Sequence, residues 1–210
     1  MRKKGIRQKN LFNDFKDMAF PIDDFALPEA KQIVFEFGTG NGAFLVNVAK
    51  RYPEKIFVGF DIKKERLWKG CYLAKSNNLT NIFFVYAKIH NILNYFDENI
   101  VDEIFVLFPD PYEKPSKAKK RLIHNNFLSF YKRILKSEGV LHFKTDNYKL
   151  YQFALNTLVE NPYFKISKLI YNIQYSYNDE DFYIPTQYET IWKRMNKTIY
   201  YLQAQKNNNN

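Results

Sequence analysis

The stretch Ile33-Val-Phe-Glu-Phe-Gly-Thr-Gly-Asn-Gly42 decides the fold, because a short β-rich run ends in three closely spaced glycines. Apolar residues then recur at positions 44, 45 and 48, a helical stripe that stops before Pro53. Glycines between a strand and a helix let the backbone turn sharply and approach a ligand closely. The stretch therefore predicts a strand, a ligand-binding turn and a helix.

Strand and helix signals alternate along the chain that follows. Short β-rich runs are separated by longer segments with helical apolar spacing. Such alternation is typical of an α/β fold with a mostly parallel, doubly wound sheet and helices on both faces. We expect further strands at residues 56–60, 82–86, 101–108 and 139–144, and helices at residues 63–76, 119–136 and 148–160.

The pattern changes after Pro162. Residues 164–177 and 198–202 are β-like, and a polar acidic loop is expected at residues 178–181. Since no helix is predicted between the two runs, we expect an antiparallel hairpin added to the edge of the sheet. Residues up to Pro28 show no clean period and receive no predicted element.

The composition favours a packed domain with an anionic partner. A chain of 210 residues, 46% hydrophobic and 18% aromatic, can build a sizeable core and is too apolar for wholesale disorder. Its 32 basic residues against 22 acidic ones leave a net charge of +10. Such a charge favours nucleic acid or another anionic surface as partner, although a merely soluble basic protein would show the same balance.

Several classes of protein are disfavoured by what the sequence lacks. The single cysteine, Cys71, excludes a disulfide framework and fits a reducing compartment, and the three histidines have no ligand spacing that would indicate a metal site. No apolar run approaches the roughly 18 residues of a membrane-spanning helix. Polar residues after the basic start interrupt any signal-peptide apolar region. We expect a cytoplasmic protein with no membrane or metal partner.

A second stretch, Val106-Leu-Phe-Pro-Asp-Pro-Tyr-Glu-Lys114, places one carboxylate between two prolines at the end of a predicted strand. The prolines restrict the backbone, so Asp110 is held stiffly where open α/β sheets bind their ligands. The basic run that follows suggests a polyanionic substrate, with a solvated helix face as the simpler alternative. Its members are Lys114, Lys117, Lys119, Lys120 and Arg121.

Two further carboxylates flank the glycine turn. Glu36 lies two residues before Gly38, where it would repel a pyrophosphate but could hold a cationic amino acid group. Asp61, at the end of the next strand, suits a ribose diol. A cofactor with a ribose and a cationic head but no phosphate is S-adenosylmethionine. The turn also satisfies the loose dinucleotide fingerprint, so an NAD-dependent oxidoreductase stays open, and either carboxylate could be an ordinary exposed or lysine-paired side chain.

Four segments share the order and approximate spacing of one family: Glu36-Phe-Gly-Thr-Gly-Asn-Gly42, Phe108-Pro-Asp-Pro-Tyr112 with Lys114 and Lys119-Lys-Arg-Leu122, Thr145-Asp146, and Thr186-Gln-Tyr-Glu189. Together they resemble the tRNA (guanine-N7-)-methyltransferases over roughly residues 31–203. The Phe-Pro-Asp-Pro segment with its basic run is the most specific, whereas the glycine turn is shared by many methyltransferases. The resemblance implies a seven-stranded class I methyltransferase fold, Rossmann-like and mostly parallel, with an antiparallel C-terminal strand. It also implies methylation of a guanine N7 in the tRNA variable loop, with S-adenosylmethionine as cofactor.

Carried over position by position, the resemblance implies a catalytic role for Asp110. It also implies three sets of contacts. The cofactor set is Glu36, Gly38, Gly40, Gly42, Asp61, Lys88 and Asp110; the substrate set is Lys114, Asp146, Thr186, Gln187, Tyr188 and Glu189; the RNA set is Lys117, Lys119, Lys120 and Arg121. From the residues alone, Asp146 could instead cap the following helix, and residues 186–189 could be a plain loop.

Two positions depart from the family pattern. Tyr112 stands where the family usually has Trp, which should preserve an aromatic wall. Lys88 stands where an acidic or amide residue normally contacts the adenine, and a lysine cannot accept the adenine amino proton. Backbone groups or Asn91 would then have to take that role.

The expected chemistry needs no general base, because guanine N7 has an in-plane lone pair and no proton to lose. Carboxylates near the guanine can stabilise the charge that develops on it. A non-catalytic RNA-binding protein on the same fold and a small-molecule methyltransferase remain alternatives, and the chain could act as a monomer or a homodimer. We expect a basic N-terminal segment (residues 1–30), a methyltransferase domain (31–205) and a disordered Asn-rich tail (206–210).

Overall fold

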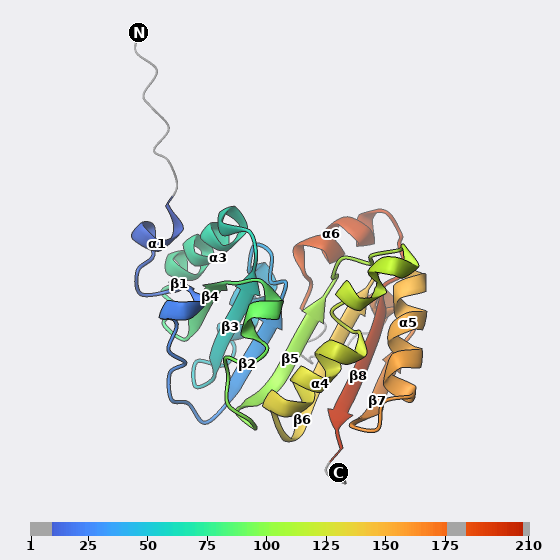
Figure 1. The fold of residues 1–210 in the computed structure, drawn as a ribbon. Helices are drawn as coiled ribbons and strands as arrows, with labels where there is room; N and C mark the ends of the chain where they lie inside the picture. The colour runs from blue at the N-terminus through green and yellow to red at the C-terminus, as the bar shows by residue number, and fades with distance from the viewer. Residues whose placement is uncertain (1–9, 176–183, 208–210) are drawn as a thin grey trace.

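The computed structural model describes residues 10–175 and 184–207, which form one central sheet (Figure 1). Its strand order is β1-β4-β3-β2-β5-β6-β8-β7. Neighbouring strands are parallel except for β8, which is antiparallel to both β6 and β7. The strands are β1 (Ala19–Pro21), β2 (Ile33–Phe37), β3 (Ile56–Asp61), β4 (Ile82–Tyr86), β5 (Val101–Leu107), β6 (Leu135–Thr145), β7 (Phe164–Ile170) and β8 (Tyr200–Lys206).

Apart from α1, which precedes β1, the α-helices connect successive strands, as expected for a doubly wound sheet. In the described part of the chain, none of them is long and apolar enough to span a membrane. The α-helices are α1 (Leu11–Asp14), α2 (Ala43–Ala49), α3 (Lys64–Ser76), α4 (Asn125–Ile134), α5 (Tyr148–Val159) and α6 (Gln187–Arg194). The 3₁₀ turns are η1 (Ile22–Asp24), η2 (Ile89–Ile92), η3 (Pro115–Lys120) and η4 (Ile173–Tyr175).

Helices cover both faces of the sheet, as the sequence predicts. Along β2, the side chains of Ile33, Phe35 and Phe37 pack in one apolar cluster with α4 and α5. Val34 points to the other face and packs in a second cluster with α2 and α3. Because a strand alternates its side chains between the two faces, the apolar residues of one strand can fill both cores at once. The predicted α/β class, with helices on both faces of a mostly parallel sheet, is thereby confirmed.

The segment for which the sequence predicts no element extends the sheet. β1 lies parallel to β4, with Ala19 opposite Phe84. Leu11 and Phe15 of the preceding segment are buried in the core beside α3. The described sheet therefore has eight strands rather than the seven that the family resemblance implies.

The predicted helix at residues 119–136 is wrong in extent. The chain forms η3, then leaves helical geometry at Arg121 and again at His124, both of which have extended backbone angles. The ring of His124 accepts a hydrogen bond from the amide of Asn126, which caps the start of α4. The chain then enters β6 at Leu135, four residues before the glycine at which the sequence predicts a strand.

The last two strands pair antiparallel, as predicted, but not as a simple edge hairpin. β8 lies between β6 and β7, so that β7 is the outer strand, and the arrow of β8 runs against that of β5 in Figure 1. The expectation of no intervening helix was wrong, because α6 lies between β7 and β8 in the chain. The predicted acidic loop at residues 178–181 lies outside the described residues.

Candidate active site

The glycine turn after β2 is fixed in a conformation that side chains disfavour. Gly38, Gly40 and Gly42 have φ angles of +78°, +59° and +67°, in the left-handed region where glycine is the favoured residue. A Cβ on Gly42 would lie 2.5 Å from a ring carbon of Phe84, so no side chain fits there. The turn thus brings its backbone close to the carboxyl edge of the sheet.

Glu36 lies beneath this turn with its carboxylate buried. Thr39 Oγ1 donates a hydrogen bond of 2.5 Å to Glu36 Oε2. Burial raises the pKa of Glu36 to about 8; the nearby Asp61 adds to the rise, while the Thr39 bond and the ammonium of Lys144 oppose it. A cationic ligand group beside this carboxylate would stabilise its ionised form.

Asp61, at the end of β3, fastens the turn to the neighbouring strand. Its Oδ2 accepts from the backbone N of Gly40 at 3.0 Å, and its Oδ1 accepts from the backbone N of Lys63 at 2.8 Å. Burial raises the pKa of Asp61, and these hydrogen bonds work in the opposite direction. The carboxylate therefore fixes the shape of the turn before any ligand is present.

A cavity of about 220 Å³ opens where the carboxyl ends of β2 and β5 face the start of α6. It brings together three residues from separate predicted motifs, namely Glu36, Asp110 and Thr186. Both carboxylates thus border one space, together with the backbone of the glycine turn. The complete lining is Glu36, Gly38, Thr39, Gly40, Asn41, Phe44, Arg66, Lys69, Leu107, Phe108, Asp110 and Thr186.

The loop that carries Asp110 leaves β5 at an unusual backbone angle. Phe108 has a φ of +49°, and its amide donates to the carbonyl oxygen of Lys144 at 2.9 Å, which ties the loop to β6. Tyr112, on the other side of the prolines, has a φ of +41°. Positive φ at residues other than glycine is strained and persists where the surroundings enforce it. Asp110 is exposed at the rim of the cavity.

The basic run divides into two parts with different surroundings. Lys114, Lys117, Lys119 and Lys120 are exposed along η3 and at its start. Arg121 is half-buried, and its guanidinium donates to the carbonyl oxygens of two loop residues and lies 4.3 Å from the ring centroid of Phe153. The lysines are available to an outside partner, whereas Arg121 is engaged within the protein.

The segment from Thr186 to Glu189 is a helix start rather than a plain loop. Thr186 and Glu189 form a reciprocal capping box at the beginning of α6. Thr186 lines the cavity, but Glu189 is 2% exposed and is not among the lining residues of the described chain. Gln187 and Tyr188 form the first turn of α6.

Asp146 and Lys88 lie away from the described cavity lining. Asp146 Oδ2 is 3.3 Å from Lys197 Nζ. It does not cap α5, because that role belongs to Asn147, whose side chain accepts from Leu150 N at 2.9 Å. Lys88 is exposed at the start of η2.

Sequence reasoning missed several residues of the cavity region. Arg66 and Lys69 extend from α3 to its rim, and Thr39 holds Glu36. Lys144 is wholly buried behind the wall and bonded to Glu189 at 3.0 Å. A signal for Lys144 existed, since it is the one cation in the apolar end of a predicted strand. The described residues contain no group of three or more His, Cys, Asp or Glu that could hold a metal ion.

Comparison with known proteins identifies the family. A family model described as "Putative methyltransferase" matches residues 30–202. The tRNA (guanine-N(7)-)-methyltransferase of Clostridioides difficile (strain 630) is 37% identical over 175 residues, which cover 82% of this chain and 79% of that protein. The protein of the same name from Halalkalibacterium halodurans is 33% identical, over 82% of this chain and 77% of that one.

Solved structures agree on the fold. The 16S rRNA methyltransferase KamB superposes with a TM-score of 0.60 at 17% sequence identity, covering 84% of this chain and 88% of that chain. Identity at that level shows the fold alone, while the sequence relatives carry the closer relationship. The chain belongs to the tRNA (guanine-N7-)-methyltransferase family and has the class I, S-adenosylmethionine-dependent methyltransferase fold.

Proposed function

We propose that this protein transfers the methyl group of S-adenosylmethionine to N7 of a guanine in the variable loop of tRNA. One observation carries the proposal beyond the family match: Glu36 and Asp110, from two separate motifs, line the same cavity. A site for methyl transfer must place a cofactor and an acceptor in contact, and the cavity joins a cofactor-type turn to a carboxylate that can face the acceptor.

The polar wall of the cavity fits the cofactor. Glu36 is a buried carboxyl whose ionised form an adjacent cation, such as the ammonium of an amino acid moiety, would stabilise. Gly38 and Gly40 leave room for close approach of a ligand to the backbone. Asp61 is not among the described lining residues but anchors the glycine turn. Its carboxylate would accept from ribose hydroxyls with the lone pairs that its hydrogen bonds to two backbone amides leave free. When bound, S-adenosylmethionine supplies an activated methyl group.

Asp110 is suited to the acceptor side. Methylation at N7 moves positive charge into the purine ring, and a carboxylate held at a fixed distance stabilises that charge without having to reorganise. The two prolines, the positive φ of Phe108 and the bonds from Arg121 all restrict the loop that carries Asp110. We assign Asp110 the catalytic, electrostatic role.

The exposed lysines beside this loop would hold the nucleic acid. Lys117, Lys119 and Lys120 lie on η3, seven to ten residues after Asp110 in the chain, so phosphates bound there would bring a nucleotide towards the cavity. We retain Lys114 and Asp146 as proposed substrate contacts. The ion pair of Asp146 with Lys197 is on the surface, so breaking it to let Asp146 contact the substrate would cost little free energy.

Incubation of the purified protein with bulk tRNA and labelled cofactor, followed by nucleoside analysis, tests the proposal. We expect labelled N7-methylguanosine, and tRNA lacking the variable-loop guanine should yield none. Label in another nucleoside, or in no nucleoside, would refute the assignment.

Calorimetry with S-adenosylhomocysteine tests the non-catalytic alternative, which arose from the lysine at position 88. Lys88 is exposed and is not part of the described cavity lining. We expect a binding signal; a protein without cofactor binding would show none. Lys88→Glu should change the affinity only if that residue contacts the adenine.

We further propose that the enzyme meets tRNA in the cytoplasm, as a monomer or a homodimer. Cys71 is a buried free thiol in the described structure, which suits a reducing compartment. Cell fractionation and sedimentation with and without tRNA would test location and assembly.

A further inference from the structure

Lys144 is a charged residue placed where a charge is unfavourable. It lies near the carboxyl end of β6, and its exposed fraction is 0%. Burial lowers its pKa, and Glu189 is the main group that works against this shift. Buried charges persist when they are closely paired, and Nζ of Lys144 donates to Oε1 of Glu189 at 3.0 Å.

Glu189 uses both carboxylate oxygens inside the protein. Oε1 accepts from Lys144, and Oε2 accepts from the backbone N of Thr186 at 2.7 Å. In return, Thr186 Oγ1 accepts from the backbone N of Glu189 at 3.1 Å. Glu189 therefore links β6 to the first turn of α6 from behind, while Thr186 is the residue of this pair that lines the cavity.

The position of Lys144 also relates it to the cofactor side. Its Nζ is 5.9 Å from the ring centroid of Phe44, which lines the cavity. The main-chain carbonyl of Lys144 accepts from Phe108, at the base of the loop that carries Asp110. One residue thus touches the elements that bear Thr186 and Asp110.

We propose that Lys144 is a positioning residue for the methyl transfer, which holds Thr186 on the cavity wall through Glu189 and the start of α6. Glu189 accordingly serves as the partner of Lys144 and not as the guanine contact that the family resemblance implies. The catalytic part of this inference rests on the proposed function.

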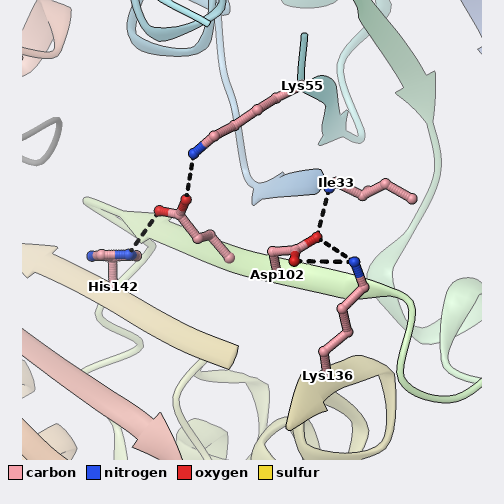
Figure 2. Close-up of polar contacts among 6 residues, drawn as sticks. Ile33, Lys55, Asp102, Lys136 and His142 are labelled. Atoms are coloured by element: carbon pink, nitrogen blue, oxygen red, sulfur yellow. Dashed lines mark hydrogen bonds and ion pairs between the residues drawn. The ribbon is translucent and has the colours of Figure 1, made fainter. Parts of the chain in front are cut away.

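The same strand supplies a matched control. At the opposite end of β6, Nζ of Lys136 is 2.8 Å and 3.0 Å from the carboxylate oxygens of Asp102, which also accepts from Ile33 N at 2.8 Å (Figure 2). This ion pair likewise joins β6 to another element, but neither member lines the cavity. Lys136→Met therefore removes a more exposed ion pair of the same strand without touching the site.

The kinetic test compares Lys144→Met, Glu189→Gln, the double variant and Lys136→Met at a temperature where thermal unfolding shows every variant folded. Glutamine can still complete a capping box, and the double variant leaves no unpaired charge buried. We expect kcat at saturating tRNA and cofactor to fall at least tenfold in Lys144→Met. Glu189→Gln and the double variant should lie within threefold of it, because all three break one connection. Lys136→Met should stay within twofold of the wild type.

Two kinetic outcomes would overturn the proposal. In one, Lys144→Met keeps a kcat within threefold of Lys136→Met. In the other, the losses from Lys144→Met and Glu189→Gln multiply in the double variant, which would mean that the two residues act separately.

Hydrogen exchange of residues 184–194 tests the link without any need for turnover. We expect the amides of Thr186 and Glu189 to exchange at least tenfold faster in Lys144→Met and unchanged in Lys136→Met, because α6 loses its attachment to β6. Unchanged exchange in Lys144→Met would overturn the proposal. If the wild type made no N7-methylguanosine, the proposed function would fail, yet this measurement would still decide whether Lys144 holds α6.

Discussion

Arg121 donates from Nε to the carbonyl oxygen of Pro111 at 3.0 Å and thereby supports the loop of Asp110 from the inside. A second bond, from Nη2, reaches the carbonyl oxygen of Tyr112 at 3.1 Å. By sequence the residue belongs to the RNA-contacting run, but its guanidinium is already engaged with these two backbone carbonyls.

Arg121→Met should therefore impair catalysis more than RNA binding. Loss of hydrogen bonds from a charged donor is typically worth about 1.5–3 kcal/mol each, and a loosened loop misplaces Asp110. We expect kcat to fall at least tenfold, while the slope of log affinity for tRNA against log salt stays within error. Filter binding over a salt series, with parallel rate measurements, checks both. A flattened salt dependence of tRNA binding together with a normal kcat would mean that Arg121 contacts tRNA rather than supporting the loop.

Lys119 and Lys120 should show the opposite behaviour. For every phosphate that a lysine no longer neutralises, the salt dependence of tRNA binding should flatten by about 0.7–0.9 log units. Lys119→Gln/Lys120→Gln should lower affinity with little change in kcat at saturating tRNA. Exposed Lys31 and Lys50, before β2 and after α2, provide the matched pair that leaves the slope unaltered. Equal slopes for both double variants would mean that the η3 lysines do not bind phosphate.

Asp110→Asn tests the catalytic carboxylate with minimal change of shape. Removal of one preorganised electrostatic group typically raises the barrier by about 3 kcal/mol, so the rate should fall on the order of 100-fold. Affinities for S-adenosylhomocysteine and tRNA should remain near those of the wild type. Near-normal turnover together with intact tRNA binding would show that Asp110 does not have the proposed catalytic role.

Cofactor binding should depend on the protonation of Glu36. Its pKa of about 8 means that the free protein carries a neutral carboxyl at pH 7, which must lose a proton to pair with an ammonium. Affinity for S-adenosylhomocysteine should thus rise with pH from 6 towards 8 and then level off. Calorimetry in buffers of different ionisation enthalpy should detect the proton released.

Two variants sharpen the pH experiment. The Glu36→Gln variant should bind S-adenosylhomocysteine more weakly, and its affinity should no longer depend on pH. In Lys144→Met, the rise of this affinity with pH should occur at higher pH, because the Lys144 ammonium favours the ionised form of Glu36. Thr39, Asp61, Arg66, Lys69 and Asp110 also border or contact this carboxyl or its cavity and are unchanged in both variants. A flat wild-type profile would show that Glu36 is ionised without a ligand.

The contacts of Glu103 with Lys55 and His142, in the central sheet, should influence the stability of the protein in acid. Burial alone would raise the pKa of Glu103, but its contacts with His142 and Lys55 bring it down to about 2 (Figure 2 shows both partners). A lowered pKa stabilises the folded state above the unfolded value of 4.5, and this contribution is lost as pH falls towards 2. The loss is on the order of 3 kcal/mol.

Glu103→Gln isolates that contribution. Urea unfolding of the wild type and the variant at pH 6 and at about pH 2.5 should show a large stability difference at pH 6 that shrinks in acid. A difference that stays constant with pH would show that the interaction does not involve the ionised carboxylate.

The meeting of Glu36 and Asp110 in one cavity could be anticipated from the sequence. Each follows from its place at the end of a predicted parallel strand, and such ends share one edge of the sheet. The helical start at Thr186 was also detectable, because Thr-x-x-Glu is a capping-box signature. The apolar residues Tyr188, Ile191 and Trp192 also follow helical spacing, but the segment Gln187–Arg194 is short and mostly polar, which makes its helical pattern weak.

Other features depended on three-dimensional packing. A run of basic residues does not reveal which member turns inward, so the inward orientation of Arg121 was not predictable from its neighbours. The ion pair of Lys144 with Glu189 joins residues 45 positions apart, and strand order across the sheet is likewise not encoded in local periodicity. The place of β8 inside the sheet followed from neither the apolar pattern nor the turn residues.

That place of β8 has a consequence for biosynthesis. β7 precedes β8 in the chain, yet in the described sheet it pairs with β8 alone. As the nascent polypeptide leaves the ribosome, β7 has no hydrogen-bonding neighbour until β8 has followed and inserted beside β6. Lys165 and Lys168 place charge on β7 while its edge is still unpaired. Charged side chains on an unpaired strand disfavour pairing with strands of other chains.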